Sequence, residues 1–296
     1  MIEIGLVNNL PDSALRATER RFRYLLRAAA GIIPFRLRCF SLSSAEPSPG
    51  AGSSIRNVRD LYLLKIDALI VTGAEPRAAS LPEEPYWRAL TELVDWAEAN
   101  THSTIWSCLA AHAAVLHLDG IERQRLAQKC SGMYDCSKVI DNWLTDDVPS
   151  SLKVSHSRLH GLSESDLRTR GYQVLTKSKN AGVDIFTRKQ QSQFIFFQGH
   201  PEYDCLSLQR EYLRDVGRYL AGDQKLYPNI PEEYFDAATI LAIEKFRTCA
   251  LAERNPALIR KFPKLTLQQN VSAKAEVAAT TIFRNWLGYL AECKAG

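Results

Sequence analysis

The sequence of 296 residues predicts an α/β fold with a doubly wound, mostly parallel sheet flanked by helices. Short apolar runs alternate with longer helical patterns along the first third of the chain, and this alternation is typical of parallel sheets. Hydrophobic residues make up 46% of the chain, which is enough to bury a large core. Two apolar runs end at Thr72-Gly73 and at Ser107-Cys108. Such strand ends share one edge of a parallel sheet, where α/β proteins bind ligands.

The first half of the chain shows these elements in order. Residues 35–40 alternate between apolar and polar side chains, as a strand does, and residues 14–30 carry Leu15, Phe22 and Leu26 at helical spacing. Residues 41–54 are rich in Ser, Pro and Gly, which indicates a flexible surface loop. The expected strands are 2–7, 35–40, 68–73 and 104–107, the expected helices are 14–30, one that closes at 61–64, and 84–100, and the expected loops are 8–11 and 41–54.

The second half is more mixed. Residues 172–175 and 183–186 are predicted to be antiparallel strands around the turn Asn180-Ala181-Gly182. A buried strand from residue 194 stops at Gly199. The other expected elements are a strand over 152–158 and helices that begin near 206 and cover 240–251 and 276–290.

Charge and cysteine content exclude several classes. The formal charge is only +4, with basic residues scattered among 33 acidic ones, so no nucleic-acid surface is expected. Seven cysteines without a CxxC pair or a cluster with His indicate free thiols in a reducing cytoplasm and no metal site. Residues 1–5 enter a strand directly, so no signal peptide is expected. No apolar run is long enough for a bilayer, so no membrane association is expected.

Cys108 stands where a strand meets an Ala-rich helical pattern. A strand, a sharp turn and a helix form an elbow that lifts one side chain above the strand ends. The N–H groups of the helix start favour negative charge at the turn, which suits a nucleophilic cysteine. The ordinary alternative is a small buried apolar cysteine. The elbow favours Cys108 as a nucleophile.

His200-Pro201-Glu202 follows the buried strand that stops at Gly199. A thiol needs a base to take its proton, and the base needs a third group to fix its tautomer. A carboxylate two residues beyond a histidine, past a rigid proline, can fold back onto the other ring nitrogen. A structural histidine is the alternative for a lone His at a strand end. Cys108, His200 and Glu202 together favour a catalytic triad.

At these residues the sequence resembles the homoserine O-acyltransferase family, which comprises homoserine O-succinyltransferases and O-acetyltransferases of the class I glutamine amidotransferase-like superfamily. The most specific match is Gly199-His200-Pro201-Glu202-Tyr203-Asp204, followed by Glu211-Tyr212-Leu213-Arg214-Asp215. The other matching stretches are Ile4 to Pro11, Val71-Thr72-Gly73-Ala74, Tyr86-Trp87, Cys108 to Ala114, Lys129 with Gly132-Met133-Tyr134, His156-Ser157-Arg158, Tyr234-Phe235 and Asn285-Trp286-Leu287.

The resemblance implies a flavodoxin-like, amidotransferase-like catalytic domain over residues 1–222, with a C-terminal helical extension over 223–296 packed on it. It also implies a homodimer without a bound cofactor. The reaction would carry a succinyl or acetyl group from acyl-CoA, the co-substrate, to the hydroxyl of homoserine in methionine-type biosynthesis.

The family's site positions fall on particular residues here. Cys108 would hold the acyl group as a thioester, with His200 as the general base and Glu202 as its partner. The substrate-contacting positions fall on Lys129, Ser157 and Arg214, where a bidentate Arg suits an amino-acid carboxylate. On the alternative interpretation, Arg214 pairs with Glu211 or Asp215 on its own helix and Lys129 is solvated. The backbone N–H groups of Leu109 and Ala74 would meet the oxyanion.

Arg77 occupies the position that selects the acyl group, which in the family is Gly for succinyl and Glu for acetyl. A guanidinium can take the free carboxylate of a succinyl group through two parallel hydrogen bonds, so Arg77 favours succinyl-CoA over acetyl-CoA. The alternative is that Arg77 turns outward and pairs with Glu75 or Glu83.

Three other functions stay open. The first is transfer to another hydroxy amino acid such as serine. The second is a glutamine amidohydrolase, although the elbow lacks flanking glycines and no synthetase domain is attached. The third is a non-catalytic member of the family, which the intact Cys108, His200 and Glu202 oppose.

Overall fold

The computed structural model describes residues 1–8, 12–42, 55–269 and 271–296, and the side chains of 12–14, 55, 271 and 272 are not described. Most of the expected loops at 8–11 and 41–54 therefore lies outside the described residues, and their first residues, Asn8 and Ser41, are instead the last residues of two strands.

The main sheet contains eight strands in the order β3-β2-β1-β4-β5-β12-β11-β8. The strands from β3 to β12 pair in parallel, whereas β11 and β8 pair antiparallel at one edge. This confirms the predicted doubly wound, mostly parallel sheet. The strands are β1 (Ile2–Asn8), β2 (Phe35–Ser41), β3 (Ile55–Asn57), β4 (Ala68–Thr72), β5 (Ser103–Ser107), β8 (Gln173–Val174), β11 (Ile185–Lys189) and β12 (Gln193–Phe197).

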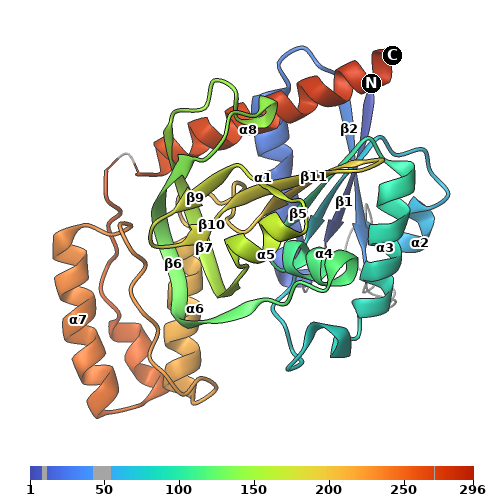
Figure 1. The fold of residues 1–296 in the computed structure, drawn as a ribbon. Helices are drawn as coiled ribbons and strands as arrows, with labels where there is room; N and C mark the ends of the chain where they lie inside the picture. Colours follow the sequence, from blue (N-terminus) through green and yellow to red (C-terminus); the bar gives the residue numbers. More distant parts are fainter. Residues whose placement is uncertain (9–11, 43–54, 270) are drawn as a thin grey trace.

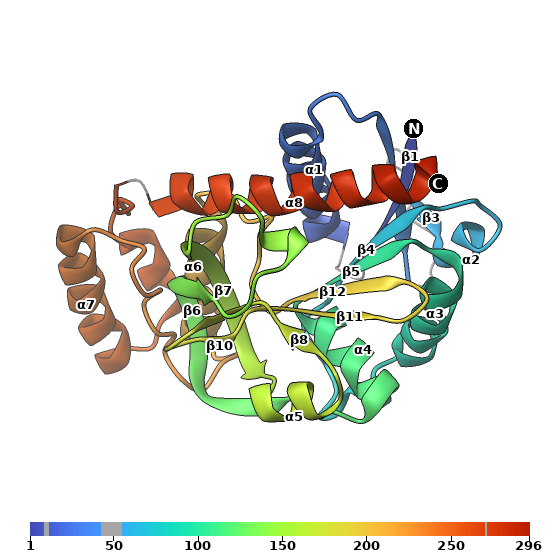
Figure 2. The ribbon, with the colours of Figure 1, turned by 45° about the horizontal axis from the view of Figure 1, so that its top comes forward.

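Helices cover both faces of the main sheet (Figures 1 and 2). On one face, α1 and α8 bury Phe22, Phe283 and Trp286 against the sheet; on the other, α3 and α4 bury Leu93 and Ala113. The helices are α1 (Asp12–Ala30), α2 (Val58–Leu61), α3 (Trp87–Asn100), α4 (Leu109–Asp119), α5 (Glu164–Thr169), α6 (Ser207–Ala221), α7 (Ala237–Ala252) and α8 (Val271–Ala295), with short 3-10 turns at Leu81–Glu83, Trp143–Thr145 and Pro256–Lys261.

A short helix was expected to close at residues 61–64, but α2 ends at Leu61. The chain turns after Leu61 instead, because the N–H groups of Leu63 and Leu64 donate to the carbonyls of Asp60 and Leu61, three residues earlier. The helix expected at 276–290 lies inside the longer α8.

A second, four-stranded sheet has the order β10-β9-β6-β7. Its strands are β6 (Gln124–Lys138), β7 (Ser151–Gly161), β9 (Thr176–Ser178) and β10 (Gly182–Val183). The expected strand over 152–158 lies in β7. The turn expected at 180–182 joins β9 to β10, whereas the strands expected at 172–175 and 183–186 correspond mainly to β8 and β11, which pair antiparallel in the main sheet. No strand was predicted for β6, because its first half is mostly exposed and has no apolar alternation.

The last third of the chain adds a helical region. Tyr212 of α6 and Phe246 of α7 belong to a small separate core with Phe235. From there α8 runs back across the main sheet, where the Trp286 indole donates to the Ser103 hydroxyl at 2.9 Å. The division at residue 222 stays a proposal. In the part of the chain that the structure describes, none of the helices has the length and apolar character to cross a membrane.

Candidate active site

Cys108 lies on the turn between β5 and α4. Its backbone angles, φ 54° and ψ −116°, are unusual for a residue with a side chain, and α4 begins at Leu109. Three hydrogen bonds hold this turn: the Cys108 N–H donates to the Phe197 carbonyl of β12 at 2.7 Å, and the N–H groups of Ala111 and His112 donate to the Cys108 carbonyl at 3.0 and 3.3 Å. The thiol is therefore presented at the carboxyl edge of the sheet by a strained backbone.

Gly73 lets the loop after β4 approach this turn. A Cβ on Gly73 would lie 2.3 Å from the Leu109 Cβ and 2.8 Å from the Leu109 nitrogen, so only glycine fits. The Gly73 N–H donates to the Ser107 carbonyl at 3.2 Å. Within the described residues, the N–H groups of Leu109 and Ala74 donate to no carbonyl. The role expected for these two N–H groups, to meet the oxyanion, stays a prediction.

His200 follows β12, the strand next to β5. Its N–H donates to the Ser155 carbonyl at 2.8 Å, and its Nδ1 lies 2.9 Å from Glu202 Oε1. The Tyr203 ring stacks on the imidazole, with centroids 4.1 Å apart and planes 20° apart. These contacts hold the ring on both its edge and its face.

The charges around His200 favour its protonated form. Burial alone lowers the pKa of His200, but Coulombic attraction and hydrogen bonds from Glu202 and Cys108 outweigh it and raise that pKa well above its usual value. The structure thus brings Cys108 and His200 close enough to interact electrostatically, although they are 92 positions apart in the sequence. His200 is suited to take and hold a proton from the thiol.

The three expected substrate contacts, Lys129, Ser157 and Arg214, join one network. Lys129 Nζ lies 2.7 Å from Asp215 Oδ2, and Arg214 contacts the other oxygen of Asp215 at 2.9 Å. The Ser157 hydroxyl donates to Glu211, which also accepts from the Tyr203 hydroxyl.

Two carboxylates one turn apart on α6, Glu211 and Asp215, therefore hold the three expected contacts together. Sequence reasoning named these carboxylates only as possible partners of Arg214, and it did not single out Tyr203 as a contact of His200. Lys129 is held by Asp215 and is not simply solvated, and Arg214 does pair with Asp215.

Arg77 lies on the loop after β4 with an exposed side chain. Its backbone N–H and that of Ala78 donate to Glu84 Oε1 at 2.6 and 2.8 Å. Glu75, one of its two expected partners, instead pairs with Arg218 at 2.7 Å.

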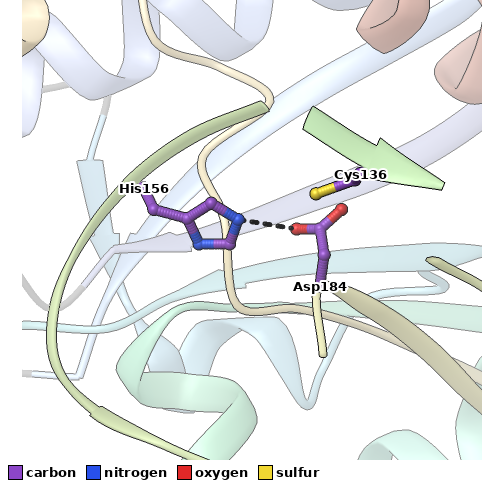
Figure 3. A group of neighbouring side chains, drawn as sticks. All are labelled: Cys136, His156 and Asp184. Carbon is purple, nitrogen blue, oxygen red and sulfur yellow. Dashed lines mark ion pairs between the residues drawn. The ribbon is translucent and has the colours of Figure 1, made fainter. Parts of the chain in front are cut away.

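A second group of titratable side chains lies deep in the protein (Figure 3). Cys136, His156 and Asp184 are fully buried, and their donor atoms all lie within 4.8 Å of one another. Such donors can bind zinc. However, Arg158 Nε donates to His156 Nδ1 at 3.4 Å, so the ring proton is on Nε2, which faces Asp184 at 3.5 Å. A cationic neighbour and a protonated Nε2 do not suit a metal, and His156 Nε2 and Asp184 Oδ1 are buried without a hydrogen-bond partner among the described residues.

Burial dominates the electrostatics of this group. It raises the pKa of the Asp184 carboxyl to about 6 and lowers the pKa of His156 well below its usual value. Both directions disfavour an ion pair.

Stability is expected to depend on pH through Asp184. A carboxyl with a raised pKa in the folded state stabilises the fold below its unfolded pKa, and this contribution is lost as the pH rises through about 6. Asp184→Asn should therefore gain about 2–3 kcal/mol relative to the native protein between pH 4 and pH 7.5. Urea unfolding across this range measures the gain, with the exposed Asp146→Asn as the control. A stability difference between Asp184→Asn and the native protein that does not change with pH would contradict the raised pKa of Asp184.

The mixed sheet with a cysteine elbow at one strand end and a histidine at the next defines a class I glutamine amidotransferase-like fold. The fold aligns with a glutamine amidotransferase from Methylobacillus flagellatus at a TM-score of 0.59 and 14% identity, covering 98% of this chain and 96% of that one. It also aligns with a glutamine amidotransferase from Thermotoga maritima at a TM-score of 0.55 and 12% identity, covering 98% of each.

Sequence comparison gives the particular family. The family model described as homoserine O-succinyltransferase matches residues 1–295. A homoserine O-succinyltransferase from Rhodopseudomonas palustris is 58% identical over 295 residues, covering 98% of this chain and 89% of the relative. One from Bradyrhizobium japonicum is 54% identical over 296 residues, covering 98% and 90%. The chain belongs to the homoserine O-succinyltransferase family, which confirms the expected family and class of enzyme.

Proposed function

We propose that this protein transfers a succinyl group from succinyl-CoA to the hydroxyl of homoserine through a thioester on Cys108. The main support is the position of Cys108 on a strained elbow next to His200, which Glu202 holds by one ring nitrogen. A nucleophile, a base and a group that orients the base are the parts that acyl transfer requires. The identities of the acyl group and of the acceptor in this proposal are taken from the names of the relatives.

In the first half of the reaction, His200 takes the thiol proton and Cys108 Sγ attacks the thioester carbonyl of succinyl-CoA. The N–H groups of Leu109 and Ala74 would stabilise the oxyanion. When the intermediate collapses, the bond to the CoA sulfur breaks and His200 protonates the leaving thiolate. In the second half, His200 takes the proton of the homoserine hydroxyl, which attacks the acyl-enzyme and releases Cys108.

The acceptor would bind over the network on α6. Arg214 is about half exposed and makes its contacts to Asp215 from one edge, so its guanidinium can turn toward a carboxylate. Lys129 and Ser157 lie beside the same two acidic residues and would complete the contacts to the amino acid. We extend the proposal to a cytoplasmic homodimer, supported for the compartment by seven free cysteines.

The direct test is product formation. The purified protein is incubated with succinyl-CoA or acetyl-CoA and with homoserine or serine, and the amino-acid products are identified by mass spectrometry. O-succinylhomoserine as the dominant product supports the proposal. Release of ammonia from glutamine without acyl transfer would contradict it.

Arg214 should bind the acceptor and not the acyl-CoA. Arg214→Lys keeps the charge but loses the planar fork, so it should raise the KM for homoserine about tenfold or more. Release of CoA in the absence of acceptor should remain near the native rate, because acylation of Cys108 comes first. The two half-reactions are measured separately by stopped flow. Loss of CoA release in this variant would place Arg214 on the donor side.

A further inference from the structure

A buried histidine in the first turns of α4 is hydrogen-bonded to the segment that carries His200. His112 Nε2 lies 2.9 Å from Gln198 Oε1, and the two side chains are only 2% and 0% exposed. His112 follows Cys108 by four residues, and Gln198 precedes His200 by two. This hydrogen bond therefore joins the helix that begins at the proposed nucleophile to the segment that leads to the proposed base.

The other contacts of Gln198 fix the direction of this hydrogen bond. Gln198 Nε2 donates to the Val183 carbonyl at 2.7 Å, and Gln198 Oε1 accepts the Leu162 N–H at 3.0 Å. The amide oxygen therefore faces His112, so the ring proton is on Nε2 and the ring is the donor. Burial lowers the pKa of His112 to about 3, although the hydrogen bond to Gln198 opposes this effect. The ring is thus neutral near pH 7, and protonation does not break the bond there.

A second hydrogen bond joins the same two elements, because the Cys108 N–H donates to the Phe197 carbonyl at 2.7 Å. With this bond alone, α4 could pivot about its first residue. A second attachment four residues further along α4 fixes the direction of the helix relative to β12. Cys108 also has strained backbone angles, which persist only where the surrounding structure constrains them. The bond between His112 and Gln198 is such a constraint.

The segment that carries His200 is also held from its other side. The His200 N–H donates to the Ser155 carbonyl of β7 at 2.8 Å. A Cβ on Gly199 would lie 2.7 Å from Asp184 Oδ1, so this residue has no room to move toward the second sheet. Loss of the bond to α4 would therefore shift Cys108 while His200 stays in place.

We propose that His112 and Gln198 are positioning residues that set the separation of Cys108 from His200 and so the rate of acylation. The inference rests on the proposed thioester mechanism. Both side chains are buried and act through the elements that they join. A displacement of reacting groups by about 1 Å can cost a factor of about 10² in rate. The effect should therefore fall on the rate of acylation and not on the binding of acyl-CoA.

The first experiment measures CoA release in a single turnover over a range of succinyl-CoA concentrations. His112→Leu removes the donor and should lower the rate at saturation about ten- to a hundredfold, with a half-saturating concentration near the native one. His112→Gln carries an amide N–H as many bonds from Cα as Nε2 and should restore most of the rate. His117→Leu is the control on the same helix and should behave as the native protein, because His117 contacts the exposed Asp95 at 2.8 Å.

The second experiment needs no acyl donor. Iodoacetamide reacts with the deprotonated thiol, so the rate at which Cys108 is alkylated at pH 7 reports proton transfer to His200. Mass spectrometry of the digested protein distinguishes Cys108 from the other cysteines. Alkylation of Cys108 should slow severalfold in His112→Leu and recover in His112→Gln. A role of His112 in stability alone would lower the midpoint of thermal unfolding and leave the alkylation rate unchanged.

Native rates of CoA release and of alkylation in a folded His112→Leu would overturn the inference. An equal loss in His112→Gln and His112→Leu would overturn it too, as would a change confined to the half-saturating concentration. If His112→Leu does not fold, His112→Asn replaces it, because its amide is one bond too short to reach Gln198. Release of CoA by the native protein from neither succinyl-CoA nor acetyl-CoA would contradict the proposed function, and the alkylation rates would still test the inference.

Discussion

Cys108→Ala should lower acyl transfer by about four orders of magnitude or more and leave no acyl group on the protein. A nucleophile and its base act as a unit, so removal of the sulfur removes the covalent route entirely. Steady-state product formation gives the rate, and mass spectrometry of the digested protein after incubation with succinyl-CoA locates the acyl group.

Cys249→Ala is the matched control for this experiment, because Cys249 is an exposed free cysteine on α7. It should transfer at the native rate and acquire the acyl group normally. An acyl mass that maps to another residue, or transfer by Cys108→Ala at the native rate, would refute the thioester mechanism.

Gly73→Ala should lower the rate of acylation about a hundredfold or more. The new methyl group would lie 2.3 Å from the Leu109 Cβ, so the loop after β4 and the first turn of α4 must move apart. Loss of one donor to an oxyanion typically costs a factor of about 10²–10³. Single-turnover CoA release measures the effect.

Gly288→Ala on α8 is the control for this substitution, because a Cβ there meets no atom within 4 Å. It should acylate at the native rate, and the unfolding midpoints of both variants show whether they fold. Native acylation in a folded Gly73→Ala would mean that the loop after β4 gives no donor to the oxyanion.

Much of the main sheet could be predicted because its strands bury both faces. Runs such as residues 68–71 are apolar without interruption, and α1 has a clear apolar face. The second sheet was only partly predicted. The exposed start of β6 has the composition of a loop, and its pairing with β7 is decided by contacts between segments far apart in the sequence.

In the candidate site, too, the sequence predicted features that depend on neighbouring residues and missed contacts between distant segments. Cys108, His200 and Glu202 could be proposed as a triad from the sequence, because a strand ends just before Cys108 and another just before His200. His200 and Glu202 are also only two residues apart. The pairing of Arg214 with Asp215 was one of the stated alternatives, because both residues are on one helix. The contact of Lys129 with Asp215 was not predicted, because it joins segments far apart in the sequence. The buried group of Cys136, His156 and Asp184 likewise comes from segments far apart in the sequence (Figure 3).

The left-handed backbone at Cys108 has a consequence for the engineering of this protein. A residue with a side chain at φ 54° and ψ −116° costs on the order of 1–3 kcal/mol, and glycine would remove most of that cost. A screen that selects only for folded, heat-resistant protein would thus favour variants with glycine at position 108. On the proposed mechanism such a screen would enrich inert variants, because the native chain gives up conformational stability at the proposed nucleophile.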